Sequence, residues 1–233
     1  MQDIHFKLFH GPALRSARVK WLLHELLGER FALEVLDTYE AEQYRADYLT
    51  INPNHAVPTL QITWPDGAVT NMIESAAMVA LLADTFAEAK LSPDPRQLTA
   101  ERVDYLQVLH FGATIDWILW QIRLHTHILA EDQKEPRTVR RYASKFAAEI
   151  EPQLQSRLDH HAFICGDTFS AADCVIGHGI AWAMAYGLCK GECFAKYLGR
   201  LALRPAYQLA FADAGGFMLE VPRDKPVVRM VSG

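Results

Sequence analysis

The sequence predicts a chain in two parts, a small mixed α/β unit followed by an all-helical region. Up to about residue 86, short strand-like runs alternate with runs of helical spacing, whereas beyond residue 98 the apolar residues recur only at helical spacing. Between these parts, Ser92-Pro-Asp-Pro95 places two prolines in four residues, which prevents a helix from continuing. We therefore expect an α/β domain at 1–86, a linker at 87–98, an all-helical domain at 99–221 and an irregular tail at 222–233.

The elements of the α/β half follow from local periodicity. Residues 4–9 alternate apolar and polar side chains before the turn-forming pair Gly11-Pro12, which is typical of a strand. Residues 13–27 show helical spacing, and Gly28 suits a helix C-terminus. The remaining expected elements are a strand at 32–36, a loose helical segment at 41–50, a hairpin of strands at 59–63 and 69–73, and a helix at 75–86. This order, βαβ, helix, ββα, is that of a thioredoxin-like fold with a parallel first strand pair and an antiparallel hairpin.

The second half shows helical patterns only. We expect helices at 98–129, at 136–160, from about 170 to 189, at 192–201 and from Arg204-Pro205 onward. Ser170-Ala-Ala-Asp173 has the form of a capping box, because an acidic residue follows a serine by three positions. The helix that it opens is apolar nearly all round, so it should lie inside the bundle, where its first amides need a built-in cap.

Composition and charge exclude several classes of protein. The net charge of −5 comes with no long basic block, so we expect no nucleic-acid partner. No run of eighteen apolar residues exists, and the N-terminus lacks the pattern of a signal peptide, so we expect a cytoplasmic protein with no membrane partner. Cys189 and Cys193 lie four apart with His178 nearby, which would permit a metal site, but buried reduced thiols are favoured and we expect no metal.

Two neighbouring segments predict a site for a small peptide-like ligand. If Pro58 is cis, Val57 turns its N–H and C=O away from a strand ladder, where they would pair with the backbone of a ligand. Further on, Ser75 would offer a hydroxyl and a helix N-terminal amide to a carboxylate. Glu74 would meet the α-amino group of the same ligand.

Five segments, in this order, resemble the glutathione transferase family of the bacterial, serine-class-like type. They are Lys7-Leu-Phe-His-Gly-Pro with Arg18–Leu27, Asn52–Pro58, Glu74-Ser75, Phe163–Asp173 and Arg204–Tyr207. The resemblance implies a homodimer that uses glutathione as co-substrate and conjugates its thiol to a small apolar electrophile. It also implies that the Val57 main chain pairs with the cysteinyl backbone of glutathione beside a cis Pro58, that Glu74 and Ser75 hold the γ-glutamyl end, and that His55 lines the groove. The lysine or glutamine that family members place before the Val-Pro is Ala56 here.

The loop that activates the thiol in this family departs from the pattern. Serine-type members place a serine four residues before the arginine that corresponds to Arg18, and this position is Leu14 here. No cysteine precedes Cys165, which disfavours cysteine-dependent thiol transfer. The candidate catalytic residues are therefore Ser16, at a helix start where the dipole favours an anion, and Arg15, by its charge. Equally, Ser16 would bond only backbone amides and Arg15 would face solvent.

The second substrate should meet the first long helix of the C-terminal half. The candidate contacts on this helix recur at three- and four-residue intervals and are His110, Phe111, Thr114 and Trp117. His10, at the end of the first strand, is a further candidate contact. Such a stripe is more often core, and His10 would equally belong to the turn. Two alternatives to conjugation stay open: a non-catalytic binding protein, which Leu14 and Ala56 favour, or a glutathione-dependent peroxidase, isomerase or ether-cleaving enzyme.

Overall fold

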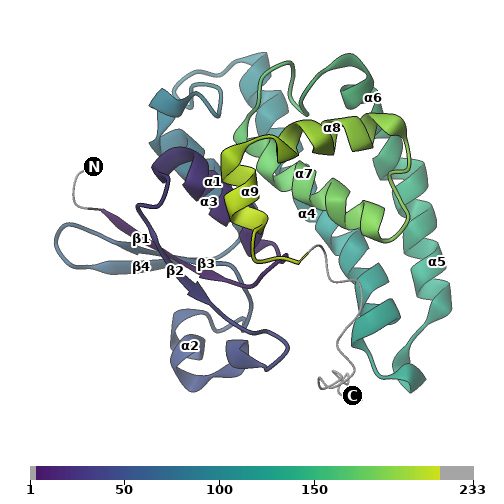
Figure 1. Cartoon of the computed structure of the whole chain (residues 1–233), viewed down its shortest axis with the longest axis horizontal. Coiled ribbons are helices and arrows are strands. Elements are labelled where there is room, and N and C mark those ends of the chain that lie inside the picture. The colour runs from purple at the N-terminus through teal and green to yellow at the C-terminus, as the bar shows by residue number, and fades with distance from the viewer. Residues whose placement is uncertain (1–3, 216–233) are drawn as a thin grey trace.

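The first half of the chain is built on one mixed sheet, in a computed structural model that describes residues 4–215. Its four strands lie in the order β2-β1-β3-β4, with β1 parallel to β2 and the other neighbours antiparallel. Their bounds are β1 His5–His10, β2 Ala32–Val35, β3 Thr59–Thr63 and β4 Val69–Met72. The predicted thioredoxin-like arrangement is confirmed, including the parallel first pair and the final hairpin (Figure 1).

The alternation of β1 distributes its side chains between two apolar clusters. Leu8 packs into the main core, to which α1 (Ser16–Leu27) and α3 (Ser75–Thr85) contribute their buried faces. Phe9 points the other way, into a small cluster with Tyr48 of α2 (Ala46–Ile51), at a ring distance of 5.3 Å. The short helix α2 thus covers the sheet on the side away from α1, just before the loop that leads into β3 (Figure 1).

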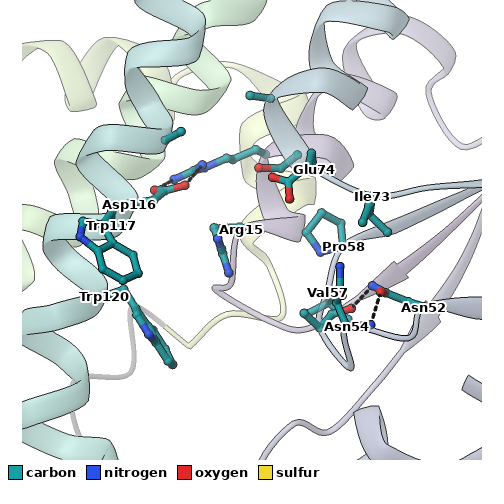
Figure 2. Close-up of a pocket in the computed structure, with 15 residues that line it drawn as sticks. Arg15, Asn52, Asn54, Val57, Pro58, Ile73, Glu74, Asp116, Trp117 and Trp120 are labelled. Carbon is teal, nitrogen blue, oxygen red and sulfur yellow. Dashed lines mark hydrogen bonds and ion pairs between the residues drawn. The ribbon is translucent and has the colours of Figure 1, made fainter. Parts of the chain in front are cut away.

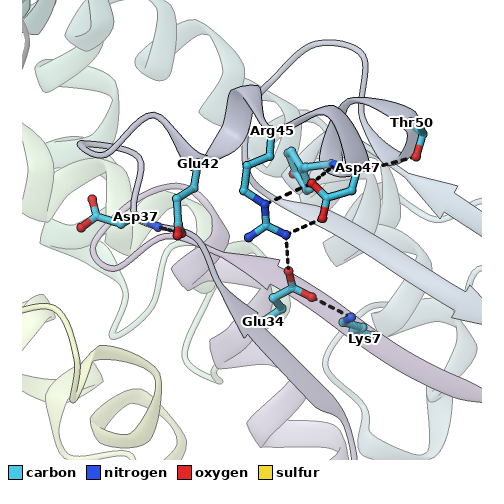
Figure 3. Close-up of polar contacts among 8 residues, drawn as sticks. Lys7, Glu34, Asp37, Glu42, Arg45, Asp47 and Thr50 are labelled. Atoms are coloured by element: carbon cyan, nitrogen blue, oxygen red, sulfur yellow. Dashed lines mark hydrogen bonds and ion pairs between the residues drawn. The ribbon is translucent and has the colours of Figure 1, made fainter.

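Surface ion pairs link this short helical segment to the sheet (Figure 3). Glu34 of β2 lies 2.7 Å from Lys7 of β1 and 3.7 Å from Arg45, at the start of α2. Arg45 in turn lies 2.6 Å from Asp47. Exposed ion pairs add little to stability, so we regard the buried ring of Tyr48 as the main anchor of α2.

The second half is a helical bundle. Its helices are α4 Ala100–Arg123, α5 Pro136–Lys145, α6 Glu151–His160, α7 Ala171–Ala185, α8 Glu192–Ala202 and α9 Pro205–Phe211. As expected, α7 lies inside the bundle, and most of its residues are buried. The short 3₁₀ turns are Glu42–Tyr44, Ala87–Ala89 and Glu131–Gln133. The domain boundaries stay predictions, and the expected irregular tail at 222–233 lies outside the described residues.

Two expected long helices are interrupted by π turns. The first continues beyond Arg123 as a π turn at Leu124–Ile128, and the second is divided into α5 and α6 by another at Phe146–Ile150. Pro152 explains the second interruption, because its ring cannot donate a hydrogen bond within a helix. Between residues 4 and 215, no helix combines the length and the apolar character that crossing a membrane requires.

The start of α7 forms the expected capping box. Asp173 accepts hydrogen bonds from the Ser170 backbone N–H at 2.8 Å and from the Ser170 hydroxyl at 3.0 Å. The Ser170 side chain also pairs with the Asp173 backbone, so both halves of the capping box are present. Asp173 also accepts from the Ile164 amide at 2.9 Å and from the Tyr197 hydroxyl at 2.8 Å. One buried carboxylate thus joins α7, α8 and the loop before them.

Candidate functional site

A pocket of about 350 Å³ lies between the sheet half and helix α4 (Figure 2). Its lining residues come from the loop before α1, from α1 itself, from the loop before β3, from the start of α3 and from α4. They are Arg15, Arg18, Asn52, Asn54, Ala56, Val57, Pro58, Ile73, Glu74, Ser75, Ala76, Ala113, Asp116, Trp117 and Trp120. The pocket therefore depends on both halves of the chain.

The loop before β3 presents main-chain groups to the pocket. The Val57–Pro58 peptide bond is cis. The Ala56 carbonyl accepts from the Tyr48 hydroxyl at 2.6 Å and from the Asn52 side-chain amide at 2.8 Å, so buried side chains fix the loop. Within the described chain, neither the N–H nor the C=O of Val57 has a hydrogen-bond partner. These two groups are free to pair with the backbone of a ligand.

The start of α3 forms another wall of the pocket. Glu74 is its N-cap residue, with φ of 75° in the left-handed region, and Ser75 is its first residue. No side chain caps the first amides of α3, so these N–H groups are available to an anion. Ser75 is 7% exposed and lines the pocket, while the Glu74 carboxylate is exposed beside it. A donor site next to a carboxylate suits the two charges of an α-amino acid group.

The loop before α1 does not place Ser16 in the pocket. The helix expected from residue 13 begins at Ser16, because Ala13 has φ of 60° and cannot belong to a right-handed helix. The Ser16 hydroxyl accepts from the Gly11 N–H and donates to the Gly11 C=O, both at 3.0 Å. Ser16 is fully buried, so its side chain closes this loop as the backbone-bonding alternative predicted.

Arg15 does face the pocket. Its side chain is exposed, and it extends between the α4 tryptophans and the Val57–Pro58 loop (Figure 2). The other arginine of the lining, Arg18, is engaged by Asp116, whose two carboxylate oxygens lie 2.7 and 2.5 Å from its terminal nitrogens. Arg15 therefore supplies the uncommitted positive charge among the lining residues.

Arg18 and Asp116 belong to a buried network beneath the pocket. Arg18 donates through Nε to His178 Nδ1 at 3.1 Å, and His178 Nε2 lies 3.0 Å from the Ala13 carbonyl oxygen. Burial acts to raise the pKa of Asp116, but the charge and hydrogen bonds of Arg18 outweigh it and lower this pKa. Burial, followed by the charge of Arg18, lowers the pKa of His178 to about 3. The network is thus an ion pair beside a neutral imidazole.

Two predicted contact histidines and one phenylalanine lie away from the pocket lining. His55 is exposed and stacks on Tyr44, with ring centroids 4.6 Å apart. His10 is fully buried, with Nε2 3.2 Å from Asp213, and burial followed by the charge of Lys20 lowers its pKa to about 4. Phe111 packs against the main core. The sequence predicts all three beside a ligand, and the structure does not place them in the pocket lining.

The α4 wall follows a different stripe from the predicted one. Trp117 lines the pocket and is 59% exposed, whereas His110 and Thr114 are exposed but do not line it. The residues that face the pocket are Ala113, Asp116, Trp117 and Trp120. Helical spacing predicts which side of α4 is turned away from the core. Which residues of that side line the pocket depends on how the sheet half packs against α4.

The cysteines take no part in this site. All four are free thiols and none lines the pocket. Burial raises the pKa of Cys165 to about 12 and that of Cys174 well above its usual range. Within residues 4–215, no three His, Cys, Asp or Glu side chains gather in a group that would hold a metal ion.

Comparisons with known proteins agree with this architecture. The family model described as glutathione S-transferase, N-terminal domain, matches residues 15–85. Glutathione S-transferase GstA of Escherichia coli O157:H7 is 30% identical over 215 residues, which span 90% of this chain and 98% of that protein.

Solved structures share the fold over most of the chain. A glutathione transferase family member from Pseudomonas fluorescens, with two glutathione bound, gives a TM-score of 0.77 at 19% identity and covers 89% of this chain and 92% of its own. A glutathione transferase from Methylococcus capsulatus gives a TM-score of 0.70 at 26% identity, over 90% of this chain and 98% of its own.

Proposed function

Because the chain belongs to the glutathione transferase family, we propose that its pocket binds glutathione and activates the glutathione thiol for attack on a small, mostly apolar electrophile. One observation carries the proposal: the unpaired main chain of Val57, the uncapped start of α3 and the cation Arg15 line the same pocket. The Val57 main chain can pair with the backbone of glutathione, the start of α3 can bind a carboxylate, and the charge of Arg15 favours a thiolate.

Glutathione would lie along the sheet side of the pocket. Its cysteinyl N–H and C=O pair with the C=O and N–H of Val57. The γ-glutamyl carboxylate accepts hydrogen bonds from the Ser75 hydroxyl and from the first amides of α3. The γ-glutamyl ammonium group pairs with Glu74. Ala56 offers no side-chain donor to the glycyl carboxylate, so affinity rests on the other contacts.

The sulfur end would lie near Arg15, opposite Trp117 and Trp120 (Figure 2). A free thiol has a pKa of about 8.5, so little thiolate is present at neutral pH. The Arg15 guanidinium lowers this pKa by stabilising the thiolate, and the proton leaves to solvent. The thiolate then attacks the electrophile that the tryptophans hold against it, forming the carbon–sulfur bond as the electrophile releases its leaving group or accepts the electron pair.

Calorimetric titration with reduced glutathione tests the binding step. We expect a dissociation constant between the micromolar and low-millimolar ranges, and weaker binding after Glu74→Gln, because the variant loses the charge that meets the ammonium group. Glu88→Gln is the matched control, since Glu88 is exposed and lies outside the pocket lining. No detectable heat of binding at millimolar glutathione would contradict the proposed site. Equal loss of glutathione affinity in Glu74→Gln and Glu88→Gln would contradict it as well.

The charge of Arg15 should set the pKa of the bound thiol. We expect Arg15→Met to raise this pKa by about one unit, which removes about 1.4 kcal/mol of differential stabilisation, and to lower turnover near neutral pH by about tenfold. The ultraviolet absorbance of the thiolate, followed against pH in the binary complex, measures the shift. Arg30→Met removes the same charge just beyond the C-terminal end of α1 and should leave the pKa unchanged. An unchanged pKa in Arg15→Met excludes Arg15 as the thiolate partner.

A non-catalytic binding protein is the second candidate. It is favoured by the burial of the Ser16 hydroxyl and by Leu14 in the position of the family serine, which leave Arg15 as the remaining candidate for thiol activation. The wild-type thiol pKa separates the two functions, because a binding protein leaves it at its free value. A panel of peroxides, isomerisable substrates and aryl ethers would identify the other glutathione-dependent reactions.

We also propose a two-fold homodimer, as family membership implies. Large apolar side chains are exposed on both halves of the chain, among them Val69 of β4 at 53%, Leu81 of α3 at 39% and Val103 of α4 at 52%. Burial of such a surface between two copies would stabilise a dimer. Light scattering at micromolar concentration measures the mass directly, and a mass equal to the 26.3 kDa of one chain would overturn this proposal.

A further inference from the structure

We infer that His178 is a positioning residue for thiol activation: by joining the Ala13 carbonyl to Arg18, it holds the loop that presents Arg15 to the pocket. The inference rests on the proposed role of Arg15. It concerns a histidine of α7, in the helical half, that lies outside the pocket lining and has no contact with the bound glutathione proposed above.

The conformation of Ala13 requires a tether. Its φ of 60° lies in the left-handed region, which disfavours a residue with a Cβ atom unless the surroundings hold it. The loop has some bonds of its own, from the Leu14 amide to the Gly11 carbonyl at 3.1 Å and from the Ala17 amide to the Leu14 carbonyl at 2.8 Å. The Ala13 carbonyl, by contrast, is held by His178, at 3.0 Å from Nε2.

The partners of His178 determine where its proton lies. The Arg18 Nε–H is a donor only, so His178 Nδ1 must accept from it. The Ala13 carbonyl is an acceptor only, so His178 Nε2 must donate to it. The ring is therefore the neutral Nε2–H tautomer. It is 3% exposed and stacks on Phe211 at 6.4 Å, with Trp182 edge-on at 6.3 Å, which limits its rotation.

The same network connects the loop to the opposite wall of the pocket. Asp116 lies on α4 and holds Arg18 through two hydrogen bonds, and Arg18 holds His178. Ala13, at the end of this chain of bonds, stands two residues before Arg15. The direction of Arg15 toward the sulfur site thus depends on α4 and α7 in the helical half, as well as on the loop itself.

Two substitutions of His178 separate its hydrogen bonds from its packing. His178→Phe keeps a planar ring and removes both bonds, whereas His178→Gln supplies one acceptor and one donor, as the neutral imidazole does. We expect His178→Phe to raise the pKa of the bound glutathione thiol by about one unit, as Arg15→Met does, and to lower the thiolate fraction near neutral pH by about tenfold. His178→Gln should keep most of the wild-type shift.

A double variant tests whether His178 acts through Arg15. If it does, Arg15→Met combined with His178→Phe raises the thiol pKa no further than either change alone. Additive shifts, or a wild-type thiol pKa in His178→Phe, overturn the inference while leaving Arg15 as the thiolate partner. An unshifted thiol pKa in the wild-type protein instead overturns the proposed function itself.

A measurement on the wild-type protein covers the case in which a variant does not fold. The ¹⁵N resonances of the His178 ring report which nitrogen carries the proton. The inference requires the proton on Nε2 throughout the pH range of activity. A proton on Nδ1, or on both nitrogens, is incompatible with a bond from the Arg18 Nε–H and overturns the inference without any substitution.

Discussion

Replacing Asp173 by alanine is expected to lower the free energy of unfolding by about 4 kcal/mol, since each buried donor left without a partner costs about 1–3 kcal/mol. The carboxylate accepts from the Ile164 amide, the Tyr197 hydroxyl and the amide and hydroxyl of Ser170, at 2.8 to 3.0 Å. Asp173, Ile164 and Tyr197 are all fully buried, so water cannot replace the lost acceptor. Urea denaturation followed by circular dichroism measures the loss.

Asp167 provides the matched control, because it is a nearby aspartate, in the loop before α7, whose side chain is 78% exposed. It accepts one longer bond, from the Ala162 amide at 3.2 Å. Asp167→Ala should therefore leave the unfolding midpoint close to that of the wild type. If Asp173→Ala behaves in the same way, then the carboxylate does not hold α7, α8 and the preceding loop together as the hydrogen bonds indicate.

Replacing Arg18 by methionine is expected to cost about 3 kcal/mol of stability, because removing one partner of a buried ion pair leaves the other charge uncompensated. Arg18 is 1% exposed and Asp116 is 7% exposed. The loss should be largest near neutral pH. The folded-state pKa of Asp116 lies below its usual value of 3.8, so the contribution of this pair is present above that value and is lost as the pH falls through the folded-state pKa.

A double-mutant cycle separates the ion pair from simple packing. Arg18→Met with Asp116→Leu removes both charges, and it should recover about half of the loss, because His178 Nδ1 still lacks its donor. Arg96→Met is the surface control, since Arg96 pairs with Asp94 while its side chain is 86% exposed. Losses that simply add in the double variant, or a single variant as stable as the wild type, would contradict this account of the ion pair.

Local chemistry allowed much of the sheet-side wall of the pocket to be predicted. Pro65-Asp-Gly67 joins the two strands of the hairpin, and the helix after Glu74 begins where an acidic and a small polar residue precede an apolar run. The structure brings Val57, Pro58, Glu74 and Ser75 to one pocket as expected. Turns and helix starts depend on residues only a few positions apart, so a sequence pattern can predict them.

The buried network could not be predicted in the same way. Arg18 is 98 positions from Asp116 and 160 from His178, and no periodic pattern connects residues so far apart. From the sequence, His178 indicates only a conceivable metal site with Cys189 and Cys193, whereas the structure places it beside Arg18 and Ala13. The left-handed conformation of Ala13 could not be predicted either, because alanine ordinarily favours a helix and the contact of its carbonyl with His178 joins distant segments.

What the sequence alone determined is therefore the order of the elements, the parallel and antiparallel pairing of the strands and the identity of the Val57–Pro58 loop that lines the pocket. These follow from periodicity and turn chemistry, which act between neighbouring residues. The tertiary structure decided the rest: that Ser16 is buried while Arg15 faces the pocket, and that Trp120 rather than Thr114 lines it. Such outcomes depend on how two halves pack together, and packing is a property of surfaces assembled from distant segments.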